Sequence, residues 1–174
     1  TVGSYMDVTG PKYTQALKQR MMDLTEEYDI NYWKLDGFVL VDNEVTSQPA
    51  YFTRFWDTWI DIFQDLREDE KDIFLNVTTG SNNSPWLLPY VNSVWLNIGT
   101  DAGYRGTGSD RDQMLTYVDD KYYTRFRVEQ SQMPLRYIYN HEPIHGIYVK
   151  NPAGRDYTQT LEEFRKYLFM CLVR

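Results

Sequence analysis

The chain has few cysteines, few basic residues and no long apolar run. Cys171 is the single cysteine among 174 residues, so no disulfide framework is possible and we expect a buried thiol. No run approaches the ~18 apolar residues of a membrane span, so no membrane partner is expected. Lys and Arg total 18 against 25 Asp and Glu, and the net charge of -7 argues against nucleic acid as the ligand. Neutral or cationic ligands remain, and the sequence leaves the compartment open.

Other features are also missing, and their absence narrows the chemistry. The sequence shows no internal repeat, low-complexity tract or linker, which favours one domain over residues 1–174. No Gly-rich phosphate loop and no nucleophilic Ser or Cys with a base is found, and we expect no cofactor. Residues 141–145 (HEPIH) superficially resemble a zinc motif. Pro143 breaks the helix that would align the two imidazoles, so we expect no metal site.

Aromatic residues are abundant, at 16% of the chain, with 15 Tyr and 5 Trp. Such side chains stack well on the apolar faces of sugars. They also fill protein cores while presenting a hydroxyl or an indole N–H to water. The composition permits both roles, and we assign most of the aromatic residues to the core.

Strand-like and helix-like segments alternate along the chain. Hydrophobic spacing predicts helices at residues 13–28, 51–66, 110–131 and 160–173, a brief helical turn at 86–90, and strands at residues 4–8, 31–36, 73–77, 93–98 and 135–139. This alternation predicts an α/β fold with right-handed βαβ units and a parallel sheet. An eight-stranded (β/α)8 TIM barrel needs ~250 residues, so we expect part of one, about strands 3 to 7. The start at Thr1 and the uncapped helical pattern at Arg174 also lead us to expect a piece of a longer protein.

Two strand-like segments each deliver an Asp near their carboxyl end. In residues 31–38 (NYWKLDGF), Lys34 and Asp36 are two positions apart and must project to the same side of a strand. There a lysine charge can keep the carboxylate ionised and bind a polar ligand. Residues 94–103 (VWLNIGTDAG) bring Asp101 to a similar position. Alone, Lys34 and Asp36 also fit an edge ion pair, and Asp101 also fits a turn residue. Together they predict a carboxylate-pair enzyme, since chemistry collects at strand carboxyl ends.

The segment YWKLD at residues 32–36 resembles the nucleophile strand of the retaining α-galactosidase-like glycoside hydrolases, glycoside hydrolase family 36 and its clan relatives. The segment MDVTGP at residues 6–11 is similar to the end of that group's third strand, and WLNIGTD at residues 95–101 resembles its sixth-strand segment. Residues 161–174 resemble the helix that leads into its last strand. The resemblance implies that Asp36 is the nucleophile, Asp101 the general acid/base and Lys34 a ligand for sugar hydroxyls.

The expected activity is retaining cleavage of terminal α-galactosidic or α-N-acetylgalactosaminidic bonds in an oligosaccharide or glycoconjugate, performed by the full-length parent. Retention predicts that the carboxyl groups of Asp36 and Asp101 lie ~5–5.5 Å apart. A related α-glucosidase-type glycosidase and a non-catalytic carbohydrate-binding or structural α/β module are the alternatives. Besides the catalytic pair, the candidate substrate-binding residues are Lys34, Trp33, Asp7, Asn76, Arg111 and His141. His141 and Glu142 follow a predicted strand and fit either the substrate mouth or a surface loop. We expect the isolated piece to be inactive and to self-associate through open sheet edges.

Overall fold

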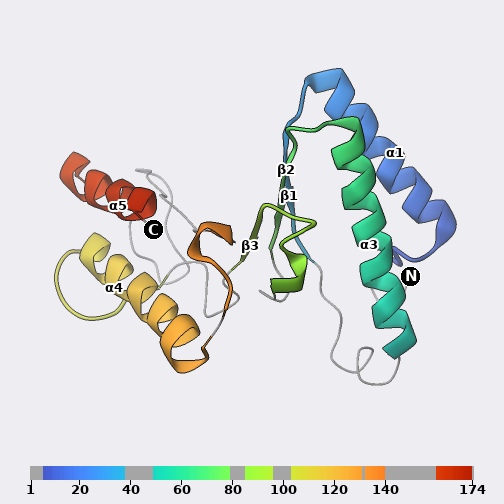
Figure 1. Cartoon of the computed structure of the whole chain (residues 1–174). Coiled ribbons are helices and arrows are strands. Elements are labelled where there is room, and N and C mark those ends of the chain that lie inside the picture. Colours follow the sequence, from blue (N-terminus) through green and yellow to red (C-terminus); the bar gives the residue numbers. More distant parts are fainter. Residues whose placement is uncertain are drawn as a thin grey trace. The chain divides into compact units, whose positions relative to one another are not determined.

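The protein mixes helices and strands in two compact units (Figure 1). The computed structural model describes residues 6–37, 49–78, 85–95, 103–130, 132–139 and 160–173. The first unit comprises Thr1–Asn82 and Trp86–Val94, and the second comprises Asn83–Pro85 and Trp95–Arg174. The expectation of one domain over residues 1–174 stays a prediction.

A parallel sheet lies at the centre of the first unit. Its strands include β1 (Tyr32–Leu35), β2 (Phe74–Val77) and β3 (Ser93–Trp95). β2 pairs in parallel with both of the others. This confirms the strands predicted at residues 31–36 and 73–77, and the described part of the one predicted at 93–98. η1 (Pro85–Leu87) precedes β3 and accounts for the start of the helical turn predicted at residues 86–90.

Helices α1 (Pro11–Tyr28) and α3 (Pro49–Asp69) cover one face of this sheet (Figure 1). α1 begins with Pro11, whose fixed φ suits the first turn, and ends at Asp29 in the left-handed conformation (φ 53°). The two helices pack side by side and are joined by an ion pair of 2.5 Å between Lys18 Nζ and Asp65 Oδ2. The helices predicted at residues 13–28 and 51–66 are therefore confirmed.

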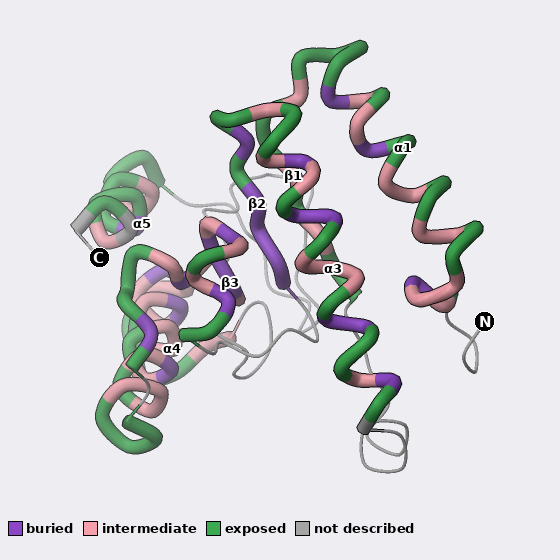
Figure 2. Tube along the Cα trace, turned by 45° about the vertical axis from the view of Figure 1, so that its right-hand side comes forward, coloured by how far each residue is buried: buried purple, intermediate pink, exposed green. Residues whose placement is uncertain are grey.

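The core of the first unit lies between these helices and the sheet. Figure 2 shows that β2 is buried along most of its length. Phe63 and Leu66 of α3 and Leu75 and Val77 of β2 are each 0% exposed. Burying side chains of this size contributes roughly 1.5–3 kcal/mol each, so the packing of α3 on β2 is a major source of stability.

The prediction of a strand at residues 4–8 is wrong in its described part, where the chain turns instead. The Gly10 backbone N–H donates to the Asp7 carbonyl oxygen at 3.1 Å, and the Thr9 backbone N–H donates to the Asp7 carboxylate at 3.0 Å. An Asp side chain that bonds the backbone two residues ahead favours a turn over an extended strand. This turn leads directly into α1.

In the second unit, α4 (Asp110–Tyr123) packs against α5 (Leu161–Val173). The Ser109 hydroxyl and the Asp112 carboxylate form a reciprocal capping box at the start of α4. The helix predicted from residue 110 to about 131 is confirmed over residues 110–128, where α4 passes directly into a π-helical segment, η2 (Thr124–Val128). There the Glu129 backbone N–H reaches back to the Thr124 carbonyl oxygen at 2.9 Å, a five-residue step. The helix predicted at residues 160–173 is confirmed.

The strand predicted at residues 135–139 is mostly a 3-10 turn. η3 (Leu135–Tyr137) occupies its first three residues, and β4 (Ile138–Tyr139) is all that remains extended. The Tyr137 backbone N–H donates to the Pro134 carbonyl oxygen at 3.0 Å, which closes the turn. The partial (β/α)8 barrel stays a prediction. Among the described helices, none has the length and apolar character that crossing a membrane requires.

Candidate functional site

Lys34 and Asp36 lie on the face of β1 that is turned away from the helices. Alternate residues of the strand differ in exposure: Tyr32, Lys34 and Asp36 are exposed, whereas Trp33 and Leu35 between them are half-buried. The Trp33 indole Nε1–H donates to Thr25 Oγ1 of α1 at 3.0 Å, which fixes the Trp33 side as the helix side. Because strand side chains alternate, Lys34 and Asp36 share the opposite face, as the sequence predicts.

Two donors converge on one oxygen of the Asp36 carboxylate. The Thr78 hydroxyl donates to Asp36 Oδ1 at 2.8 Å, and the Gly37 backbone N–H donates to the same oxygen at 2.8 Å. Gly37 has φ of 82°, a left-handed conformation that ends the strand and that side-chain-bearing residues rarely adopt. Thr78 follows β2 and is 2% exposed, so a buried residue of the neighbouring strand holds an exposed carboxylate.

A polar row runs across the sheet one step before Asp36. Lys34 pairs in register with Asn76, and Asn76 pairs with Ser93. The Asn76 amide Nδ2 donates to Ser93 Oγ at 2.7 Å. Asn76 is 0% exposed, and no donor among the described residues reaches its Oδ1 atom. A buried amide oxygen without a donor costs about 1–3 kcal/mol, which is unusual inside a packed sheet.

Asp7 lies in the turn before α1 and bonds to the first turn of α3. Its Oδ1 accepts from the Thr9 hydroxyl at 2.7 Å and from the Tyr51 hydroxyl at 3.2 Å. Burial raises the pKa of the Asp7 carboxyl, but the hydrogen bonds from Thr9 and Tyr51 outweigh it and hold the pKa below its ordinary value. Asp7 is therefore an ionised carboxylate held by a local network.

Two other candidate residues occupy packing positions. Trp33 faces α1, so the structure does not bring its ring together with Lys34 and Asp36. Arg111 of α4 is 3% exposed, and its guanidinium carbon lies 4.5 Å from the centre of the Tyr167 ring of α5. This stacking contributes to the α4 and α5 contact. Substrate binding by Trp33 and Arg111 stays a prediction.

Asp101 and His141 lie outside the described residues, as does the HEPIH segment at 141–145. The carboxyl separation expected for the catalytic pair therefore stays a prediction. Within residues that the structure describes, no three His, Cys, Asp or Glu side chains gather in a way that suits a metal ion.

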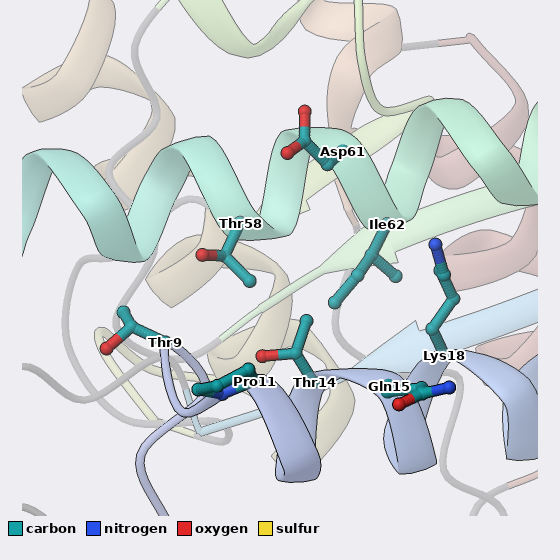
Figure 3. Close-up of a pocket in the computed structure, with 8 residues that line it drawn as sticks. All are labelled: Thr9, Pro11, Thr14, Gln15, Lys18, Thr58, Asp61 and Ile62. Atoms are coloured by element: carbon teal, nitrogen blue, oxygen red, sulfur yellow. The ribbon is translucent and has the colours of Figure 1, made fainter.

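Two hollows of the described structure are lined by residues other than Lys34, Asp36 and Thr78. A groove of about 380 Å³ runs between α1 and α3, with Thr58 and Ile62 pointing toward Thr14 and Lys18 (Figure 3). The Thr58 hydroxyl donates to the Arg54 carbonyl oxygen, and Lys18 is paired with Asp65. The second hollow, of about 430 Å³, belongs to the second unit. It is lined by Tyr122, Tyr123, Phe126, Arg127, Met133 and Leu135.

Sequence reasoning missed Thr78 and Ser93. The signal for Thr78 was present, because Asn76 and Thr78 are two residues apart at the end of a predicted strand, as are Lys34 and Asp36. Applying the same alternation would have placed Asn76 and Thr78 together on one face of their strand, and the register of β1 and β2 makes this the face of Lys34 and Asp36. Ser93 carried no such signal, since its partner depends on the register of β3.

No family model, curated protein or solved structure matches this chain.

Proposed function

We propose that this chain is part of a retaining glycoside hydrolase whose nucleophile is Asp36. The observation that carries the proposal is the position of Lys34 and Asp36, together on the exposed face of β1 at the carboxyl end of a parallel sheet. Strand carboxyl ends are where α/β enzymes gather their reacting groups. The expected substrates are terminal α-galactosides or α-N-acetylgalactosaminides, as the resemblance to glycoside hydrolase family 36 implies.

The proposed reaction needs one ionised and one protonated carboxyl group. Asp36 attacks the anomeric carbon and forms a glycosyl ester as the glycosidic C–O bond breaks and Asp101 protonates the departing oxygen. Asp101 then removes a proton from water, which attacks the same carbon and releases Asp36. Hydrogen bonds from Thr78 and Gly37 favour the ionised form of Asp36, and the charge of Lys34 on the same face acts in the same direction.

Lys34 suits recognition of sugar hydroxyls beside Asp36. Its ammonium group is a hydrogen-bond donor, and a hydroxyl group can accept from it. Lys34 is exposed, whereas its register neighbour Asn76 is 0% exposed, so substrate binding by Asn76 stays a prediction. We infer that Lys34 binds substrate hydroxyls close to the reacting carbon.

The second candidate function is a carbohydrate-binding or structural module without catalysis. The hydrogen bonds from Gly37 and Thr78 to Asp36 favour it, because a carboxylate that only caps the end of a strand makes the same contacts. The two functions differ in what removing each carboxylate does to turnover.

The test compares Asp36→Ala and Asp101→Ala in the full-length parent on a nitrophenyl α-galactoside and on a natural α-galactoside. A nucleophile has no substitute, so Asp36→Ala should lower kcat by about 10⁴-fold or more on both substrates. A good leaving group needs no proton, so Asp101→Ala should lose about 10²–10⁴-fold on the natural substrate and far less on the aryl one.

Asp57→Ala is the matched control, because Asp57 is an exposed carboxylate on α3 outside the site. It should keep wild-type kinetics. Equal losses on both substrates in Asp101→Ala would remove its acid/base role. Wild-type turnover in Asp36→Ala would favour the non-catalytic module.

A further inference from the structure

Among the described residues, two acceptors lie within reach of the Thr78 hydroxyl, and the shorter contact is to Asp36. It lies 2.8 Å from Asp36 Oδ1 and 3.2 Å from the Leu35 carbonyl oxygen. That carbonyl already accepts the Thr78 backbone N–H at 2.9 Å. A hydrogen bond to an ionised acceptor is about twice as strong as a neutral one, so the single hydroxyl proton goes to the carboxylate.

We propose that Thr78 is a positioning residue that holds the Asp36 carboxylate by Oδ1 and thereby fixes its rotation for attack on the anomeric carbon. The inference rests on the proposed glycosidase function. Thr78 and Gly37 both donate to Oδ1, so two bonds from the ends of different strands orient the carboxylate. The oriented carboxylate forms a bond to the anomeric carbon as the glycosidic C–O bond breaks, and the electron pair of that broken bond leaves with the protonated oxygen.

Burial of Thr78 gives its hydroxyl a fixed position from which to hold the Asp36 carboxylate. Thr78 is 2% exposed and its side chain is β-branched, which restricts rotation about χ1. Its backbone N–H is bonded to Leu35, the residue that precedes Asp36. The hydroxyl therefore fixes the rotation of an exposed carboxylate from a rigid point on the neighbouring strand. Misplacing a reacting group by about 1 Å can cost on the order of 10²-fold in rate.

The kinetic test compares Thr78→Val and Thr78→Ser in the full-length parent with an aryl α-galactoside. Valine keeps the branched shape and removes the donor, whereas serine keeps the donor. We expect Thr78→Val to lower kcat by about 10–100-fold with KM within about threefold of wild type. Thr78→Ser should keep kcat within about threefold. Thr58→Val, which removes a threonine hydroxyl from α3, should leave both constants unchanged.

Equal kcat in Thr78→Val and the wild type would overturn the proposal. Equal damage from serine and valine would overturn it as well, because only the hydroxyl is assigned a role.

A double-mutant cycle separates this inference from the glycosidase proposal, because it measures unfolding in urea and needs no activity. Thr78→Val should lower the unfolding midpoint more in the wild-type background than in the Asp36→Ala background. Equal shifts would show that the hydroxyl does not bond the carboxylate, whatever the turnover. Unequal shifts in a protein without α-glycosidase activity would keep the Thr78 contact and reject the glycosidase function.

Discussion

Asn92 joins β2, β3 and α3 at one point, and its replacement should destabilise the first unit. Its Oδ1 accepts from the Leu75 backbone N–H at 2.9 Å and from Arg67 Nη2 at 2.6 Å. Its own backbone N–H donates to the Leu75 carbonyl oxygen at 2.8 Å. The side chain of Asn92 thus completes the hydrogen bonding of a strand residue that is 0% exposed.

Asn92→Ala removes the shared acceptor and leaves two donors without it. An unsatisfied buried backbone N–H costs about 1–3 kcal/mol, and a lost hydrogen bond to a charged group costs about 1.5–3 kcal/mol. Arg67 is partly exposed and keeps its bond to the Tyr90 carbonyl oxygen at 3.1 Å, so losing its bond to Asn92 costs less than this full range. We expect the free energy of unfolding to fall by about 2–4 kcal/mol.

The assay is urea unfolding of the chain at low concentration, followed by tryptophan fluorescence. With a slope of roughly 2 kcal/mol per M, the midpoint should fall by about 1–2 M. Asn92→Asp is the matched control. It keeps an oxygen acceptor and adds a charge opposite Arg67, so it should retain most of the stability. A midpoint in Asn92→Ala close to the wild-type value, or equal losses in both variants, would refute the reasoning.

Three further predictions address the candidate site and the assembly. Lys34→Met and Lys34→Glu should each lower kcat of the full-length parent by about 10–100-fold, since a hydrogen bond to a charged group contributes about 1.5–3 kcal/mol. Wild-type kinetics in Lys34→Met would show that Lys34 serves only as a structural ion pair. Tyr51→Phe should destabilise the chain at neutral pH. Because the folded-state pKa of Asp7 is depressed, ionised Asp7 contributes stability that is present above its unfolded-state pKa and lost as pH falls through its folded-state pKa. The difference in urea midpoint between Tyr51→Phe and the wild type should therefore shrink from pH 7 to pH 3. A difference that stays constant over this range would contradict the prediction. The 174-residue chain, assayed alone, should self-associate and be inactive on an aryl α-galactoside, because the proposed partial barrel would leave open sheet edges. Sedimentation that shows an active monomer would contradict this prediction.

The sequence predicted the local structure well where one periodicity dominated. The apolar spacing in α1 and α3 identified both helices, and the alternation in β1 placed Lys34 and Asp36 on one face. It failed where short-range hydrogen bonds competed with the pattern. The Asp7 carboxylate bonds the backbone of Thr9 and turns the chain where a strand was predicted. η2 departs from the α-helical hydrogen-bond step, which the spacing of apolar residues does not encode.

The sequence by itself determined which side chains share a face, because the direction of a side chain on a strand depends only on the parity of its position. The tertiary structure decided which face the helices cover and which residues of different strands become neighbours. The pairing of Lys34 with Asn76, and the bond from Thr78 to Asp36 across 42 positions of the chain, depend on the register of β1 and β2. Register is set by packing between distant segments, and a shift of one residue would move every side chain to the other face.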